Sequence, residues 1–286
     1  FRDRSKNTFK MKYKTRIFKN KPLIAGSVLV LLVLVVAIFA PYLSIHDPYE
    51  MNFDRRLEMP SKSHWLGTDN FGRDLWSRIA LGSRVSALIA ILSVSASAIL
   101  GTLAGLYAGY KGGWFDLIIM RIVDIFLGFP VLILSLALVA ALGPGEINIV
   151  IALIFVYWGR FTRIVRGETL SAKENEYVVA ARTLGASTTR ILFVHILRNI
   201  WGPPVVFGTL SLGTAILTES ALSFLGFGAS PPTPTWGWIM AYGLRYIQTV
   251  PWFPIVPGLA IMITVLGFNL FGDGLQDYLD PKNRTL

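Results

Sequence analysis

The stretch LIAGSVLVLLVLVVAIFA, from Leu23 to Ala40, decides the fold, because it carries no charged side chain along its length. A single α-helix needs about 18 to 20 consecutive apolar residues to cross the hydrocarbon core of a bilayer. The whole chain has a similar balance, since 53% of its 286 residues are hydrophobic and only 15% are charged. A soluble domain would need more charged surface than this. We therefore interpret residues 23–43 as a transmembrane helix.

A basic arm, residues 1–22, precedes this helix and holds nine Lys or Arg against one Asp. Positive residues beside a membrane span stay on the cytoplasmic side, so the arm predicts a cytoplasmic N-terminus. The arm also supplies most of the net charge of +10, which leaves no basic patch that would indicate nucleic acid as a partner. A cleaved signal peptide is the alternative, but its apolar core would be shorter.

Five further apolar segments predict an all-α, polytopic membrane protein with about six transmembrane helices and both termini in the cytoplasm. The segments cover about Val85–Tyr110, Phe115–Leu142, Ile147–Val165, Pro203–Phe227 and Tyr246–Gly272. An extracytoplasmic loop, residues 44–84, separates the first helix from a five-helix core, residues 85–286. A cytoplasmic loop, residues 166–200, lies within this core.

Small residues recur every four positions in the second span and form a strip on one helix face. They are Ser93, Ser97, Gly101, Gly105 and Gly109. Such a strip allows another helix to approach closely. The partner lies either within this chain, which we favour, or across a pore.

Charged residues inside a span are costly and mark internal pairs or functional positions. Arg121 and Asp124 lie three residues apart in the third span, so they share a helix face and can pair, or they can act in gating. Glu219 lies deep in the fifth span, with Ser223 one turn later. We interpret these residues as candidates for a translocation path or gate, and a structural brace is the alternative for Glu219.

A polar stretch, ENEYVVAARTLGASTTRILFVHILRN, runs from Glu174 to Asn199 between the fourth and fifth spans. It predicts two short helices outside the bilayer. Gly185 suits a left-handed helix C-cap, and Ser187 suits the N-cap of the next helix. Two helices carried rigidly between spans indicate a docking site whose partner can push on the membrane helices.

This stretch resembles the characteristic loop of bacterial ABC-importer permeases, where Glu-Ala-Ala is followed after three residues by Gly and after nine more by Ile-x-Leu-Pro. The matching residues are Ala180, Ala181, Gly185 and Leu197. The departing residues are Val179, His195 and Arg198. The resemblance implies an ATPase-coupling loop that includes Glu176, Ala180, Ala181, Gly185, Ala186, Ser187 and Leu197.

Other segments resemble the C-type permease subunits of dipeptide and oligopeptide ABC importers. They are HWLGTDNFGRDLWSR (His64–Arg78), GSRVS (Gly82–Ser86), LTESALSFLGFG (Leu217–Gly228), PPTPTWGWIM (Pro231–Met240) and GDGLQDYLDPK (Gly272–Lys282). The signature of the outer loop includes Gly67, Thr68, Asp69, Gly72, Arg73 and Asp74. Its charged residues either stabilise the loop by pairing with one another and with Arg78, or contact a binding protein or close the outer mouth of the path.

The resemblance implies a type I ABC-importer permease in the bacterial cytoplasmic (inner) membrane. It implies a path for peptides shared with a homologous permease subunit in a heterodimer. Two cytoplasmic ATPase subunits, which would hold ATP and Mg, and an extracytoplasmic substrate-binding protein are the other implied partners. Close relatives carry nickel, metal chelates or glutathione, so these remain alternative substrates.

The sequence contains no Gly-x-x-x-x-Gly-Lys-Ser/Thr loop, so we expect no nucleotide cofactor on this chain. It has no cysteine and no His-Glu-x-x-His motif, and we predict neither a metal site nor catalytic residues. A calcium loop at Asp69 is rejected because the regular alternation of oxygen ligands is missing. Two alternative functions remain: an ion-driven secondary transporter that uses Glu219, and a membrane scaffold or receptor without transport.

Overall fold

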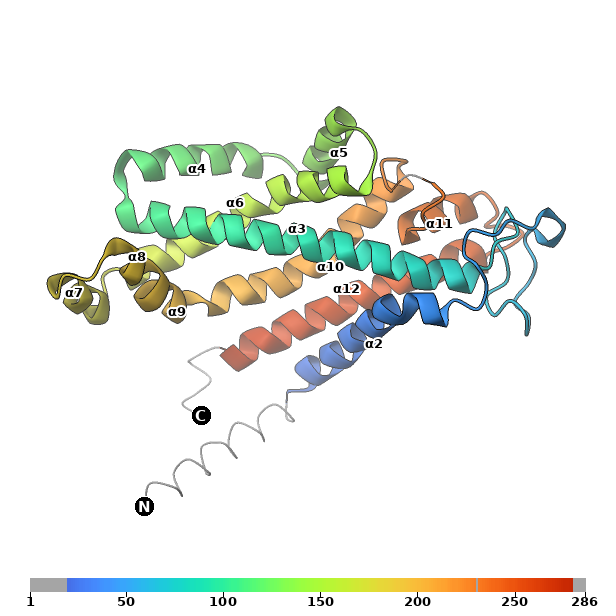
Figure 1. Ribbon diagram of the computed structural model, residues 1–286, viewed down its shortest axis with the longest axis horizontal. Coiled ribbons are helices and arrows are strands. Elements are labelled where there is room, and N and C mark those ends of the chain that lie inside the picture. Colours follow the sequence, from blue (N-terminus) through green and yellow to red (C-terminus); the bar gives the residue numbers. More distant parts are fainter. Residues whose placement is uncertain (1–19, 230, 280–286) are drawn as a thin grey trace, which may run out of the picture.

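The computed structural model describes residues 20–229 and 231–279, which form an elongated bundle of helices (Figure 1). Within these residues, five helices are long and apolar enough to cross a membrane. They are α2 (Lys21–Leu43), α3 (Leu75–Lys111), α6 (Glu146–Ala172), α10 (Gly202–Phe224) and α12 (Trp252–Leu279). The predicted all-α membrane fold is confirmed. The basic arm lies mostly outside the described residues.

The third predicted span is not one continuous helix. It is divided into α4 (Gly113–Leu127) and α5 (Val131–Leu142), which are bent by 95° relative to one another. The cause is Pro130, which has no backbone N–H to donate and which disfavours a helical conformation at the preceding residue. The bent pair leads from the end of α3 to the start of α6. Counted as one broken span, it brings the candidate membrane spans in the described residues to six.

Two predicted helix starts are also shifted. The α3 helix begins at Leu75, well before Val85, because the side chain of Asp74 accepts the Ser77 N–H at 2.8 Å and caps the first turn. The last helix begins at Trp252 instead of Tyr246. Pro254 then lies in the first turn, where the missing N–H of proline costs no hydrogen bond.

The remaining helices are short and lie at the ends or sides of the bundle. They are η1 (Phe53–Arg55), α7 (Glu176–Thr183), α8 (Thr188–Arg190), the π-helix η2 (Ile191–Ile196), α9 (Leu197–Ile200) and α11 (Trp236–Leu244). Figure 1 shows α7 and α8 at one end and the long loop before α3, residues 44–74, at the other. We refer to these as the α7 end and the loop end.

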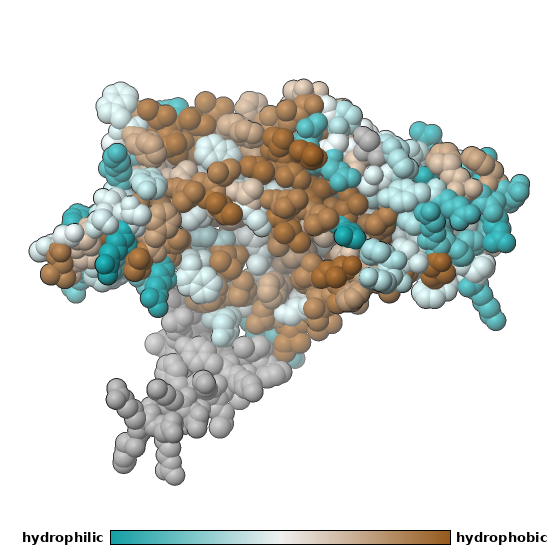
Figure 2. Space-filling model, viewed as in Figure 1, coloured by the Kyte–Doolittle hydropathy of each residue, from teal (hydrophilic) through white to brown (hydrophobic). Residues whose placement is uncertain are grey.

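A broad apolar band lies between the two ends, which are more hydrophilic (Figure 2). Large apolar side chains remain exposed in this band, such as Leu31 on α2 and Leu266 on α12. Exposed apolar surface of this extent is typical of contact with lipid or with another subunit. The start of α2 and the end of α12 lie together, because Asn20 Nδ2 donates to the Gly274 carbonyl at 3.1 Å.

The strip of small residues on α3 packs against α6 within the chain, as the favoured interpretation predicts. A Cβ atom at Gly101 would lie 2.6 Å from the Trp158 carbonyl oxygen, so any larger residue would push the helices apart. Ser97 Oγ contributes a hydrogen bond of 3.2 Å to the Ile154 carbonyl. The α3 and α6 helices are therefore held at close distance along their length.

Gly105→Ala is expected to lower the melting temperature of the purified protein, because its Cβ would lie 2.6 Å from the Thr162 carbonyl oxygen. The expected loss is about 1–3 kcal/mol. Gly167→Ala on α6 is the matched control, since its Cβ would meet nothing within 4 Å. Alanine there favours the helix by up to about 1 kcal/mol. Equal melting temperatures for the two variants would contradict the close α3–α6 contact.

Candidate functional site

The loop at the α7 end has the two predicted helices and both predicted caps. Gly185 follows α7 with φ +77°, and the Ala186 N–H donates to the Ala181 carbonyl at 3.0 Å. Ser187 Oγ accepts the Arg190 N–H at 3.4 Å and caps α8. This backbone is fixed by local sequence, because a positive φ favours glycine and a short hydroxyl suits an N-cap.

The α7 helix has one buried face and one exposed face. Val178 is buried in a hydrophobic cluster with Leu106 of α3, Val165 of α6 and Ile196 of η2, and Ala181 is also buried. The other face presents Tyr177, Ala180 and Leu184 to the outside, at helical spacing of three and four residues. The buried face ties α7 to α3 and α6, so a force on the exposed face can reach both.

The predicted coupling residues divide between these environments. Those that are exposed are Glu176, Ala180, Gly185 and Ser187, those that are half-buried are Ala186 and Leu197, and Ala181 is buried. A further contact supports the docking of α7 on α3, because the Arg182 guanidinium lies 5.6 Å from the centre of the Tyr110 ring. Leu184 is 87% exposed and is the most prominent apolar side chain of this loop.

At the loop end, Asp69 organises the long loop. Its Oδ1 accepts the backbone N–H groups of Phe71 at 2.8 Å and Arg73 at 3.0 Å. Its Oδ2 lies 2.7 Å from Arg73 Nε and 3.4 Å from Arg78 Nε. All three charged side chains are buried. A buried carboxylate is stable only when its oxygens are bonded in this way.

Asp74 is the second buried carboxylate of the long loop. Its Oδ2 caps α3, and its Oδ1 lies 2.8 Å from His64 Nδ1. Arg55 Nη1 lies 3.3 Å from His64 Nε2, and the Thr68 hydroxyl donates to the Arg55 carbonyl. The structure therefore brings the predicted signature together. Gly67 and Gly72 complete it, with φ of +75° and +76° in tight turns.

His46, His64 and Asp74 place possible metal-ligand atoms within 4.8 Å of one another. Both ring nitrogens of His64 already have partners, Asp74 and Arg55, and His46 Nε2 lies 2.9 Å from the Ser63 carbonyl. A positively charged guanidinium beside a ligand also disfavours a second cation. We interpret the cluster as a hydrogen-bond network of the loop.

Glu219 lies inside the bundle and is completely buried. It accepts hydrogen bonds from Ser86 Oγ and Ser223 Oγ, each at 2.7 Å, and from Ser220 Oγ at 3.4 Å. Ser86 belongs to α3, whereas the other residues belong to α10. Glu219 and Ser223 thus connect two helices, and their role in a path or gate stays a prediction.

Glu219→Ala is expected to lower the melting temperature, because it leaves the hydroxyls of Ser86 and Ser223 without an acceptor. An unpaired buried polar group costs about 1–3 kcal/mol. Glu219→Gln keeps an acceptor oxygen and should lose less. Thermal melting and the apparent KM for the transported solute are the measurements. Unchanged melting with a changed KM would assign Glu219 to the path instead of a brace.

Residues 101–285 match the family described as binding-protein-dependent transport system inner membrane component. The chain belongs to this family. Residues 14–60 also match the N-terminal TM domain of oligopeptide transport permease C. The protein is therefore an inner-membrane permease of an ABC importer.

Relatives of this permease cover most of its length. It is 45% identical to the dipeptide transport system permease protein DppC of Alkalihalophilus pseudofirmus, over 93% of this chain and 88% of that protein. It is 41% identical to the oligopeptide transport system permease protein OppC of Bacillus subtilis, over 94% and 88%. It is 43% identical to the glutathione transport system permease protein GsiD of Pectobacterium atrosepticum, over 99% and 95%.

The permease does not contain the predicted pair of Arg121 and Asp124. Asp124 lies 2.5 Å from Arg163 Nη2, and Asp116 accepts two hydrogen bonds from Arg166, at 2.5 and 2.6 Å. The prediction was wrong because α4 packs along α6, whose arginines reach both carboxylates. Arg121 is exposed and has no acidic partner within the described part of the chain. Opposite charges in adjacent predicted spans are the signal that could have found these pairs.

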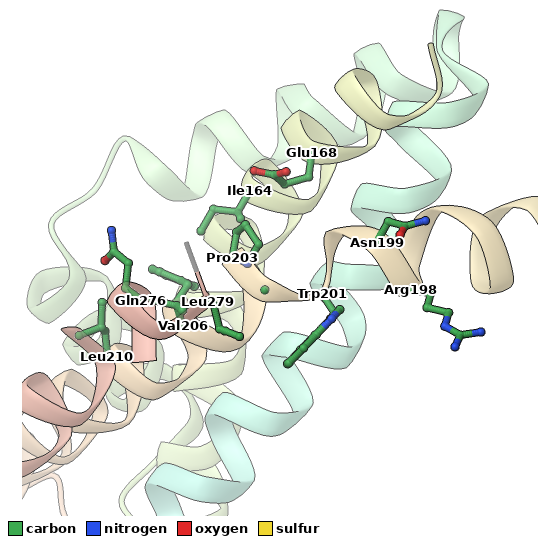
Figure 3. A pocket seen from close by; sticks show the side chains of 12 residues that line it. Ile164, Glu168, Arg198, Asn199, Trp201, Pro203, Val206, Leu210, Gln276 and Leu279 are labelled. Atoms are coloured by element: carbon green, nitrogen blue, oxygen red, sulfur yellow. The ribbon is translucent and has the colours of Figure 1, made fainter. Parts of the chain in front are cut away.

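Two hollows of the permease were not predicted. A cavity of about 800 Å³ lies at the α7 end, and its polar lining residues include Glu168, Arg198, Asn199 and Gln276 (Figure 3). Another of about 710 Å³ lies between α5, α10, α11 and α12 and is mostly apolar, with Ser220 and Asn269 among its lining residues. Both are formed by segments far apart in sequence, so no local pattern could indicate them.

Proposed function

We propose that this permease forms half of a translocation path for short peptides, with a homologous permease subunit forming the other half. Two ATPase subunits, which hold ATP and Mg, dock at α7, and an extracytoplasmic binding protein docks at the long loop. The observation that carries this proposal is the exposed apolar face of α7. That face is backed by a buried cluster on α3 and α6, and α3 extends to the long loop.

The α7 end is proposed to face the cytoplasm, with both termini on that side. Residues 160–198 hold seven Lys or Arg against three acidic residues, in addition to the basic arm. This is the charge bias expected of cytoplasmic segments. The contact of Asn20 with Gly274 supports the placement of both termini at one end.

Peptides are favoured as substrates because dipeptide and oligopeptide permeases are among the relatives that match nearly the whole chain. Glutathione, itself a modified tripeptide, is the second candidate, since a glutathione permease matches at 43% identity. The mostly apolar cavity of about 710 Å³ between α5, α10, α11 and α12, which we call the groove, is the proposed surface of the path. It carries a few polar groups among apolar ones.

The decisive experiment is purification of the tagged permease from its native membrane, followed by reconstitution in liposomes. We expect a second permease and ATPase subunits to copurify. We also expect ATP-dependent uptake of labelled dipeptides when the copurified or co-expressed binding protein is added. Competition with unlabelled glutathione separates the two substrate candidates. Uptake that continues without ATP would favour an ion-driven transporter instead.

A further inference from the structure

A pocket of about 290 Å³ lies at the loop end, apart from the groove proposed as the path. Its walls come from the long loop, from Arg78 in the first turn of α3, from residues 231–233 and from α11. The side chains that matter are Phe71, Arg73, Arg78, Thr233, Trp238 and Tyr242. Neither the groove proposed as the path nor the exposed face of α7 contributes a lining residue to this pocket.

The pocket contains more positive than negative charge. Arg73 and Arg78 are only 4% and 3% exposed, and both share the single carboxylate of Asp69. Arg78 Nη1 also donates to the Pro48 carbonyl at 2.8 Å. The Arg73 Nη1 and Nη2 atoms, in contrast, bond to no residue in the described ranges. A buried guanidinium with two free parallel donors is suited to bind a carboxylate through both oxygens.

The aromatic walls hold this guanidinium in place. Arg73 lies over the Phe71 ring at 4.6 Å, and Phe71 packs edge-on against Tyr242 at 6.0 Å. Trp238 stacks on Tyr242 at 5.4 Å, and its Nε1 donates to the Ala229 carbonyl. Rigid Tyr, Trp and Arg side chains around a small pocket are the composition of strong binding centres in protein interfaces.

We propose that this pocket receives an acidic side chain of the external binding protein. The inference rests on the proposed function, which supplies such a partner. Charge complementarity favours a carboxylate, and the position favours a docked protein over transported cargo. Trp238 and Tyr242 line the pocket, whereas Met240 on the same helix lines the groove. The pocket and the groove share no lining residue.

Occupation of the pocket would act on α11, which separates it from the groove. Gly237 of α11 packs so closely on α10 that a Cβ there would lie 2.7 Å from Ser223 Cβ. Trp236 Nε1 donates to the Ile79 carbonyl of α3 at 3.0 Å. The α11 helix thus contacts the same two helices that Glu219 connects. Docking at the pocket can therefore shift the position of α11, the helix beside the proposed path.

Thr233→Glu tests the proposal, because it puts a carboxylate of the permease itself into the pocket beside Arg73. Thr233→Gln has nearly the same size without the charge, and Thr233→Lys has the opposite charge. In reconstituted complexes, we expect Thr233→Glu to weaken binding of the purified binding protein by about tenfold, while Thr233→Gln stays close to wild type. Thr233→Lys should retain binding. Melting temperatures show whether each variant is folded.

Equal affinity of all three folded variants for the binding protein would overturn the proposal. Unchanged affinity together with a higher KM for a free peptide would overturn it too, and would assign the carboxylate to the cargo. If Thr233→Glu does not fold, competition by acetate decides instead. Excess acetate should weaken binding of the binding protein to the wild-type complex more than chloride does at equal ionic strength, and an equal effect of the two anions would overturn the proposal. The proposed function itself fails only if the wild-type complex shows no ATP-dependent uptake, so the two failures are distinguishable.

Discussion

Leu184→Glu is expected to reduce ATP-driven uptake by at least about tenfold while the melting temperature stays unchanged. Leu184 is 87% exposed, so its replacement removes no internal packing. A large apolar side chain exposed outside the apolar band indicates a protein contact. An anchor of this kind contributes about 2 kcal/mol or more to an interface when it is buried centrally, and a carboxylate there adds a desolvation cost.

Uptake in reconstituted vesicles and copurification of the ATPase subunits are the two measurements for this variant. Leu184→Met is the matched control, because it keeps an apolar side chain of similar volume. A substitution of Gly185 gives a less clear test, because its φ of +77° would strain any other residue. Such a variant would combine an effect on folding with an effect on docking. Wild-type uptake by Leu184→Glu would show that ATPases dock elsewhere.

The transmembrane helices could be predicted because each depends on a local property, the length of an uncharged apolar run. The caps at Gly185, Ser187 and Asp74 also depend on neighbouring residues, although only the first two were predicted. The break at Pro130 follows from local rules as well. Apolar composition, however, is the same on both sides of the break, so hydropathy merged α4 and α5 into one span.

Contacts between distant segments could not be predicted. Ser86 reaches Glu219 across 133 positions, and Asp116 reaches Arg166 across 50. The sequence indicated that Asp69 and the nearby arginines could pair, because they lie within one loop. It did not indicate that two arginines share one carboxylate, since this depends on how α3 and the loop pack. Pairing within a helix turn was the wrong guide for Asp124, whose partner lies on α6.

Asp69→Asn is expected to destabilise the long loop by about 3–5 kcal/mol, because it removes the charge that compensates two buried arginines. The amide still has one oxygen for a backbone N–H, but its NH₂ group faces donors. Thermal melting of the purified permease and the rate of proteolysis of the loop measure the effect. Asp54→Asn is the control, because Asp54 is exposed in the same loop and its replacement should change stability by less than about 0.5 kcal/mol.

The double variant Asp69→Asn with Arg73→Met separates two causes of destabilisation. One is the lost attraction between the carboxylate and the guanidinium groups, and the other is the cost of burying arginines that have no compensating charge. If the large loss comes from leaving two cations without a carboxylate, removal of one of them should restore part of the stability of Asp69→Asn. Additive losses would show instead that each side chain contributes independently. Arg78 would then keep its bond to the Pro48 carbonyl as its remaining compensation. A recovery would show that the buried charge balance around Asp69 holds the loop over the start of α3.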